Sequence, residues 1–242
     1  NLIRTVEEHQ QPMQRYLELR KRLLGVEQLH MYDVYVPMIE KTEKKYSFEE
    51  AKHMVLNALS VLGSEYTGLL EKGFHERWID IYENEGKRSG AYSWGAYGTH
   101  PYVLLNYQGN LNHVFTLAHE MGHALHSWYS DEHQLYIYAG YRIFVAEVAS
   151  TCNEALLIHY LMEQSKKAGD QKKTMYLINY FLEQFRTTLF RQTMFAEFEK
   201  ITHGLQEQGE TLTADRLCEI YYDLNKLYFG EEICVDQEIA ME

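Results

Sequence analysis

Three features of the 242-residue sequence predict a mainly α-helical fold with a small β-sheet. Only three prolines interrupt the chain, so long stretches are free to be helical. Several segments repeat apolar residues at helical spacing, and 45% of all residues are apolar, which is enough to bury a core and excludes a disordered chain. One glycine-interrupted stretch, residues 90–107, is instead rich in the aromatic and branched residues that favour strands.

The first half of the chain carries three helix signals. Residues 13–24 place apolar side chains at three- and four-residue spacing. Ser47, followed three residues later by Glu50, is the signature of a capping box, and it predicts a helix that extends to Leu62. A short helix is expected over residues 65–72.

The middle of the chain predicts two strands and then two long helices. Glycines divide residues 90–107 into two short strands joined by a turn. Asn112 can cap a helix over residues 114–129, and a second helix is expected over residues 144–167. The loop between them, residues 131–141, is long enough for the two helices to lie antiparallel.

Two further helical segments complete the chain. Residues 172–200 place aromatic side chains at helical spacing, and we expect these to pack in the core. They are Phe181, Phe185, Phe195 and Phe198. Residues 213–229 form the last predicted helix. No repeat, low-complexity tract or linker divides the sequence, so we expect a single domain over residues 1–242.

Charge, cysteine number and hydropathy narrow the class of protein. The 35 acidic residues outnumber the 23 basic ones, and no basic run is present, which argues against a nucleic-acid binder that follows phosphates. Cys152, Cys218 and Cys234 lie far apart without a C-x-x-C pair, so we expect a protein of the reducing cytoplasm with neither a disulfide nor a cysteine zinc site. No window approaches the ~18 uninterrupted apolar residues of a membrane span.

His119-Glu120-Met121-Gly122-His123 is an H-E-x-x-H sequence inside a predicted helix. Residues four apart share one helix face, so both histidines can bind one Zn²⁺. Glu120 then lies beside the ion, where it can take a proton from a bound water whose pKa the zinc lowers towards neutrality. The motif arises by chance in a chain of this composition with a probability of roughly one in fifteen, so its setting matters.

The setting strengthens the zinc interpretation in two ways. A buried helix that contains Leu117 and Met121 has little reason to hold two histidines and a glutamate unless something compensates their desolvation. Gly122 costs a helix about 1 kcal/mol relative to Ala, which indicates the close approach of another backbone. The alternative is a group of core histidines held by hydrogen bonds.

A third protein ligand is expected, because catalytic zinc sites use three and leave the fourth position to water. The candidates are His113, His126, His133, Glu147 and Glu154. His113 is expected to precede the helix, and His126 would demand three ligands from one helix. Glu147 is favoured because it lies on the facing helix among apolar neighbours that imply burial, and a buried carboxylate needs a partner.

Two residues are candidates for a supporting role. Glu154 lies seven residues beyond Glu147 and therefore on the same helix face. We expect it to orient a ligand histidine, and a surface salt bridge is the alternative. His126, one turn beyond His123, is a second candidate for such a role.

The sequence HEMGHALH at 119–126, followed by FVAEVAST at 144–151 and then Asn153-Glu154, resembles the active site of the thimet oligopeptidase-like zinc peptidases, in particular the oligoendopeptidase F group. Residues 186–199 are also similar to that group, and the likeness extends from about Tyr92 to Phe229.

The resemblance implies one zinc per chain, held by His119, His123 and Glu147, with Glu120 as the general base. It also implies a helical, zincin-like peptidase domain with a channel that admits short peptides and excludes folded proteins. The edge of a small sheet beside the active site would pair with the extended substrate, which suits residues 90–107.

Members of that group also carry a long helical region upstream, and downstream a segment with Tyr and His that stabilises the oxyanion. Because the chain starts at Asn1 and ends at Glu242 without these parts, we expect it to be an internal catalytic fragment. Loss of an oxyanion donor typically lowers the rate about a hundred- to a thousand-fold.

We therefore expect a cytoplasmic zinc metalloendopeptidase that hydrolyses internal bonds of short peptides. One alternative is a zinc-stabilised helical module that binds peptides without cutting them. Another is a thiol hydrolase built on Cys152, which is disfavoured because a thiol in an apolar helix more often packs. The sequence does not indicate the oligomeric state or the preferred cleavage site.

Overall fold

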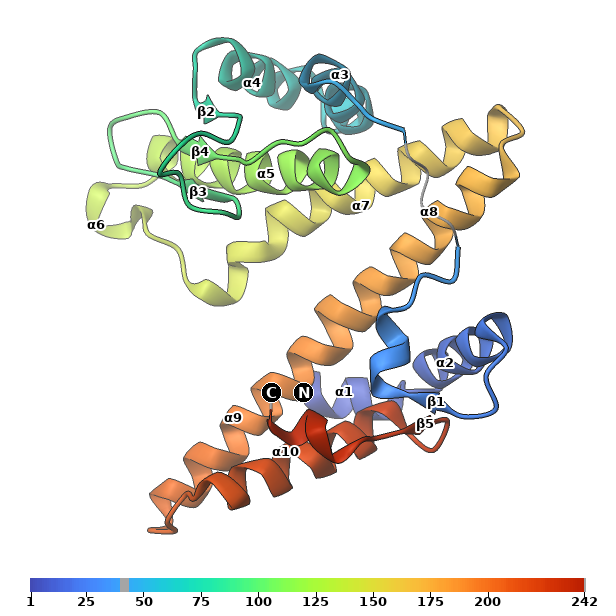
Figure 1. The fold of residues 1–242 in the computed structure, drawn as a ribbon. Coiled ribbons are helices and arrows are strands. Elements are labelled where there is room, and N and C mark those ends of the chain that lie inside the picture. Colours follow the sequence, from blue (N-terminus) through green and yellow to red (C-terminus); the bar gives the residue numbers. More distant parts are fainter. Residues whose placement is uncertain (40–43, 242) are drawn as a thin grey trace. The chain divides into compact units, whose positions relative to one another are not determined.

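The computed structural model describes residues 1–39 and 44–241, and most of them are helical (Figure 1). They form two compact units, one from Asn1–Lys41 with Met175–Glu242 and the other from Thr42–Thr174. Short strands occur in both units. The predicted fold class, mainly α with a small sheet, is confirmed, while the expectation of a single domain over residues 1–242 stays a prediction.

The second unit begins with the predicted capping box. Helix α3 (Phe48–Leu59) starts at Ser47, whose hydroxyl accepts a hydrogen bond from the backbone N–H of Glu50. The Glu50 carboxylate accepts the Ser47 backbone N–H in return. The helix continues as a 3₁₀ turn, η2 (Ser60–Leu62), and α4 (Ser64–His75) follows.

A three-stranded sheet lies against the next helix. Its strands are β2 (Ile79–Asp80), β3 (Tyr92–Trp94) and β4 (Tyr102–Leu104), in the order β2-β4-β3. The antiparallel β3–β4 pair confirms the two predicted strands. β2, which pairs in parallel with β4, was not predicted, because two residues are too few to show alternation.

The two long helices of this unit are α5 (Leu111–His133) and α7 (Ile143–Lys167), with the short α6 (Tyr136–Ala139) between them. The expectation that Asn112 caps the first of them is wrong. Asn110 is the cap, because its extended backbone lets its side chain accept the N–H of His113. His113 therefore lies inside α5 and does not precede it.

Helices α5 and α7 pack side by side and antiparallel, as predicted (Figure 1). The direction follows from three contacts, in which successive positions of α5 meet descending positions of α7. His119 contacts Glu154, Gly122 faces Ser150, and His123 contacts Glu147. Leu117, Ala118, Met121 and Leu125 have no exposed surface, so much of the surface of α5 is buried in the core.

The first unit joins both ends of the chain. From the N-terminal part come α1 (Leu2–Glu8), α2 (Gln11–Leu24), β1 (Leu29–His30) and the 3₁₀ helix η1 (Met31–Tyr35). The C-terminal part supplies α9 (Arg191–Glu207), α10 (Ala214–Phe229), β5 (Ile233–Cys234) and the 3₁₀ helix η4 (Gln237–Met241). β1 and β5 pair in parallel, with His30 opposite Cys234.

A long helical run leads into α9. It consists of α8 (Gln171–Gln184) and a π-helical turn, η3 (Phe185–Phe190). Phe195 and Phe198 pack against the core of the first unit, as predicted. The prediction is wrong for Phe185, which is 45% exposed, because helical spacing alone does not say which face is covered.

Within residues 1–39 and 44–241, no helix is both long enough and apolar enough to cross a membrane.

Candidate metal centre

Three predicted ligand side chains converge where α5 packs on α7. The Nε2 atoms of His119 and His123 lie 3.1 Å apart, and each is 3.3 Å from Oε2 of Glu147. We call these three residues the α5–α7 cluster; their donor atoms all lie within 4.8 Å of one another. The H-E-x-x-H spacing sets the two imidazoles one turn apart on one helix face, and the antiparallel partner brings the carboxylate to them.

The expected burial of Glu147 is wrong, although its contacts with the histidines are present. Its side chain is 59% exposed, and neighbouring Phe144 is 87% exposed. Apolar side chains in the first turns of α7 are exposed. The apolar neighbours of Glu147 in the sequence therefore did not imply that Glu147 is buried. The carboxylate is held instead by Ser150, whose Oγ donates to Oε2 of Glu147 at 2.8 Å.

Glu154 is hydrogen-bonded to the ring of His119. Nδ1 of His119 donates to Oε1 of Glu154 at 2.5 Å, and the Glu154 side chain is only 19% exposed. Burial opposes the charged form of His119, but the hydrogen bond and charge of Glu154, with the charges of Glu120 and Glu147, outweigh it and raise the pKa of His119. The neutral ring held in this way keeps its lone pair on Nε2, the atom that faces Glu147 and His123.

The pKa of His123 moves in the opposite direction. Burial lowers it, and the nearby His119 adds to the fall, while Glu147 opposes it. His123 is therefore biased towards the neutral imidazole, which is the form that binds metals.

Gly122 explains how the helices come close enough. A Cβ atom at this position would lie 2.6 Å from the Cα of Ser150 and 2.9 Å from the carbonyl oxygen of Ala149. Only glycine permits this approach of two backbones, as the sequence predicted. Asn153 adds a bridge, because its amide donates to the carbonyl of Ala118 and accepts from the hydroxyl of Tyr66 on α4.

Glu120 is buried next to this cluster, and its Oε2 atom has no hydrogen-bond partner among the described residues. Burial is the main cause that raises the pKa of Glu120 to about 7; His119 opposes the rise, and Glu147 and Glu154 add to it. A carboxyl group with this pKa can both take and give a proton near neutral pH.

The other candidate histidines do not join the cluster. His126 stacks on Tyr141 with ring centroids 3.8 Å apart, and its Nδ1 is buried without a partner among the described residues. His113 accepts the backbone N–H of Gln108, and His133 donates to the carbonyl of Tyr129. The supporting contact expected from His126 to a ligand is not among the hydrogen bonds of residues 1–39 and 44–241.

Sequence reasoning missed Ser150 and Asn153 as parts of the site. Both are almost fully buried on α7, at 0% and 1% exposure. A small polar residue in an apolar helix next to a candidate ligand was the available signal for Ser150. Cys152, the basis of the thiol alternative, is exposed, and within residues 1–39 and 44–241 no hydrogen bond joins it to a histidine.

Comparison with known proteins agrees with this arrangement. The sequence profile of peptidase family M3 matches residues 1–241. Oligopeptidase PepF of Bacillus subtilis is 50% identical over 242 residues, which are 100% of this chain and 36% of that protein. The chromosomal oligoendopeptidase F of Lactococcus lactis subsp. cremoris is 43% identical over 241 residues, 100% of this chain and 39% of that protein.

Solved structures give the same result. The oligoendopeptidase-F structure from Enterococcus faecium matches 99% of this chain and 34% of its own, with a TM-score of 0.65 and 34% identity. A structure from Chlamydophila abortus matches 100% of this chain and 41% of its own, with a TM-score of 0.86 and 40% identity. The chain spans well under half the length of these relatives. From its match over residues 1–241 we conclude that it belongs to peptidase family M3.

Proposed function

We propose that the protein is a cytoplasmic, zinc-dependent metalloendopeptidase that hydrolyses internal bonds of short peptides. The observation that carries the proposal is the convergence of His119, His123 and Glu147 beside the buried carboxyl group of Glu120. Membership of peptidase family M3 and the names of the relatives support a peptidase.

The donor set fits zinc in kind and in spacing. Two imidazole nitrogens and one carboxylate oxygen are common zinc ligands, and three protein ligands leave a fourth position for water. Zinc–ligand bonds of about 2.0 Å in a tetrahedron require ligand atoms about 3.3 Å apart. The distances within the α5–α7 cluster are 3.1 to 3.3 Å, so these three side chains would hold one zinc with little movement.

When bound, zinc supplies a Lewis acid that lowers the pKa of water to about 7 and polarises a peptide carbonyl. Glu120 accepts the proton of the attacking water on its carboxylate and passes it to the departing amine. Its raised pKa suits both transfers. No covalent bond between the peptide and the chain is needed.

Two side chains hold the ligands in place. Glu154 fixes the proton of His119 on Nδ1, which leaves Nε2 free to bind the ion. Ser150 fixes the rotamer of the exposed Glu147 through its hydroxyl group.

The sheet beside α5 supports an extended peptide as the substrate. β3 is an edge strand, so it can pair with another strand through its backbone groups, whatever the side chains of that strand. Gly95, which follows β3, packs on α5 so closely that a Cβ atom would lie 2.8 Å from the Cβ of Ser127. Ser127 is one turn beyond His123, and a peptide along β3 would therefore run past the α5–α7 cluster.

An apolar hollow next to the cluster could accept a substrate side chain. It has a volume of about 430 Å³ and lies between η2, α4, α5 and α7. Its wall contains Leu62, Tyr66, Val145, Val148 and His126. We propose that His126 contributes to this wall without binding the metal.

The test is Glu120→Gln in the full-length protein. The amide is nearly isosteric but cannot accept the proton of the water, so we expect zinc content to stay at one ion per α5–α7 cluster and hydrolysis of a quenched fluorescent peptide of about ten residues to fall by at least a hundredfold. Glu132→Gln, at an exposed position of the same helix, is the matched control and should leave the rate unchanged.

Three results would count against the proposal. Retention of a tenth of the activity by Glu120→Gln would remove the general-base role. A wild-type protein that binds zinc and peptide without cleaving the peptide would favour the peptide-binding module. Absence of zinc from the metal-replete protein, or full zinc retention in the His119→Ala, His123→Ala variant at this cluster, would remove the metal centre.

A further inference from the structure

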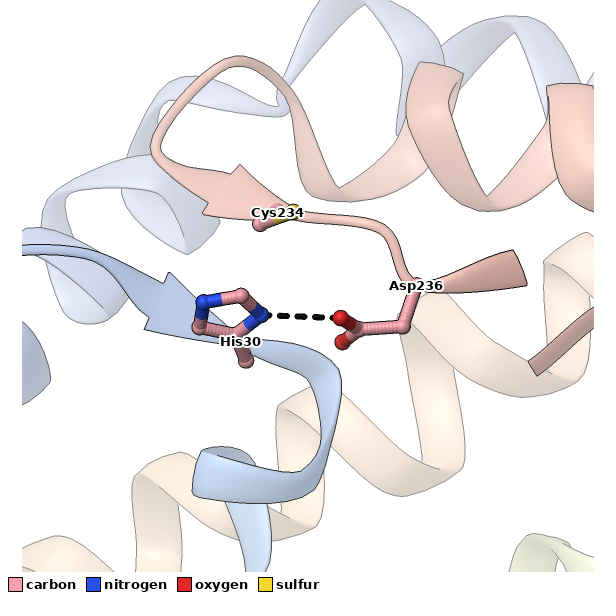
Figure 2. A group of neighbouring side chains, drawn as sticks. All are labelled: His30, Cys234 and Asp236. Atoms are coloured by element: carbon pink, nitrogen blue, oxygen red, sulfur yellow. Dashed lines mark hydrogen bonds and ion pairs between the residues drawn. The ribbon is translucent and has the colours of Figure 1, made fainter. Parts of the chain in front are cut away.

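A second group of metal-binding side chains lies in the first unit, at the parallel β1–β5 pair. His30 on β1 and Cys234 on β5 occupy paired positions, so their side chains project from the same face of the two-stranded sheet. Asp236 follows two residues after Cys234, and its Oδ1 accepts Nδ1 of His30 at 2.8 Å. Figure 2 shows the three side chains facing one another; we call them the β1–β5 cluster.

The three donor atoms are close enough to share one ion. A nitrogen of His30, the Sγ of Cys234 and a carboxylate oxygen of Asp236 all lie within 4.8 Å of one another. Tetrahedral zinc with bonds of about 2.0 to 2.3 Å places its ligand atoms roughly 3.3 to 3.8 Å apart. Small rotamer changes would therefore bring the three atoms to bonding distance.

The surroundings hold two of these side chains in place. The second carboxylate oxygen of Asp236 accepts the backbone N–H of Met31 at 3.2 Å. The ring of His30 stacks on Tyr32 with centroids 5.1 Å apart and an angle of 10°. The side chains of His30 and Asp236 are 30% and 23% exposed, so an ion and a water molecule can reach them from solvent.

We propose that His30, Cys234 and Asp236 form a second metal site, which takes a zinc-class divalent ion and leaves a fourth position to water. Thiolate and imidazole ligands together favour Zn²⁺ and Co²⁺ over Mg²⁺ and Ca²⁺, which prefer oxygen ligands only. On binding, the Cys234 thiol gives its proton to solvent and the sulfur bonds to the metal as a thiolate.

A Cys–His–Asp set also has the composition of a nucleophilic triad, but the geometry favours a metal. A triad requires a hydrogen bond between the thiol and the imidazole. The hydrogen bonds of residues 1–39 and 44–241 include His30 with Asp236 but none between His30 and Cys234. An ion instead requires donor atoms that lie close together, and these three lie within 4.8 Å of one another.

The metal site would link the two segments that form the first unit, Asn1–Lys41 and Met175–Glu242. β1 and β5 are two residues long, so their pairing includes few hydrogen bonds. An ion held by both strands would close a loop of about 200 residues. The cluster contains one cysteine and one histidine, and these are about 200 positions apart in the sequence. A C-x-x-C spacing is therefore absent, and the cysteine pattern predicted no zinc site.

Cobalt provides a probe that separates the two clusters. The α5–α7 cluster has no sulfur ligand, so a thiolate-to-cobalt charge-transfer band in the near ultraviolet reports the β1–β5 cluster alone. The full-length protein is stripped with a chelator and titrated with Co²⁺. We expect two cobalt ions per chain and a charge-transfer band that saturates with one of them.

Variants assign the band to residues. Cys234→Ser should abolish it and remove one cobalt per chain, while Cys218→Ser, which changes another free cysteine of the same unit, should leave both unchanged. Asp236→Asn should weaken the cobalt affinity of this site by more than the roughly 10- to 100-fold typical of outer-shell partners. The His119→Ala, His123→Ala variant should keep the band. The band therefore tests the β1–β5 cluster even if the proposed peptidase function is wrong.

The proposal would be overturned by a wild-type protein that shows no charge-transfer band at saturating Co²⁺. A band that survives Cys234→Ser would overturn it as well. If Cys234→Ser did not fold, the band and the metal content of the wild-type protein would decide the question without it.

Discussion

Glu120 distinguishes the α5–α7 cluster from a set of hydrogen-bonded core histidines. A structural carboxylate in a buried position is expected to find a donor, because an unpaired one costs several kcal/mol. Oε2 of Glu120 has no such donor among the described residues, and burial raises the pKa of Glu120 to about 7. An acid held in this state is suited to proton transfer.

A Glu154→Gln variant tests whether Glu154 orients the ring of His119. Glu154→Gln removes the charge that favours the Nδ1 proton and weakens the hydrogen bond to it, so we expect zinc affinity to fall about 10- to 100-fold. Competition with a chromophoric chelator measures the affinity. Glu163→Gln, at an exposed position of the same helix, is the control and should have no effect. Equal affinities for wild type and Glu154→Gln would show that the pair with His119 is only structural.

The close approach of α5 to α7 depends on Gly122. Gly122→Ala places a Cβ atom 2.6 Å from a backbone atom of Ser150, and a backbone cannot rotate away as a side chain can. We expect a loss of about 1 to 3 kcal/mol of unfolding free energy, as for an overpacked core. The helices must move apart, so Glu147 should also separate from the histidines and zinc affinity should fall.

The control for this variant is Gly68→Ala on α4, where an added Cβ meets nothing within 4 Å. Alanine there is expected to stabilise the helix by about 0.5 to 1 kcal/mol. Urea unfolding and metal competition of both variants provide the comparison. If Gly122→Ala were as stable as Gly68→Ala and bound zinc equally well, the close helix contact would have no role in the site.

The features of the helices that the sequence predicted correctly depend on local patterns. The capping box at Ser47, the helix over residues 144–167 and the close contact at Gly122 each follow from neighbours within a few positions, and all three are confirmed. The N-cap of α5 was misplaced by two positions because Asn110 and Asn112 are equivalent as caps until the backbone conformation is known. The burial of Glu147 was wrong because apolar neighbours do not say which face a helix covers.

Pairings between distant segments had no sequence signal. β1 and β5 are two residues each, and neither shows alternation, so their register and the meeting of His30 with Cys234 become visible only in the structure. The convergence at the α5–α7 cluster was predictable because two of its residues are four positions apart and the third follows one loop later. The β1–β5 cluster offers no comparable spacing.

In the first unit, one buried charge cluster joins the N-terminal segment to the segment that begins at Met175. Glu183 on α8 accepts hydrogen bonds from Arg20 on α2, at 2.9 Å, and from Arg186 in the π-helical turn, at 2.7 Å. Both arginines are buried, at 2% and 4% exposure, and Tyr16 also donates to Glu183. One carboxylate therefore compensates two buried guanidinium groups.

This arrangement makes stability depend on pH. Burial by itself favours the neutral form of Glu183, but the hydrogen bonds and charges of Arg186, with Tyr16 and Arg20, outweigh it and lower its pKa. Because the folded pKa lies below the unfolded value of about 4.3, the carboxylate contributes stability that is fully present above that value. The contribution is lost as the pH falls through the lowered pKa.

Glu183→Gln should therefore cost stability at pH 7 and progressively less in acid. Removing one partner of a buried ion pair costs roughly 3 to 5 kcal/mol, and because Glu183 is 25% exposed we expect the lower end, about 3 kcal/mol. Urea unfolding at a series of pH values measures the difference from wild type. Glu207→Gln, at an exposed position of α9, should show little difference at any pH. A difference for Glu183→Gln that stayed constant down to pH values where the wild-type carboxylate is protonated would mean that its shape, and not its charge, holds the two arginines in place.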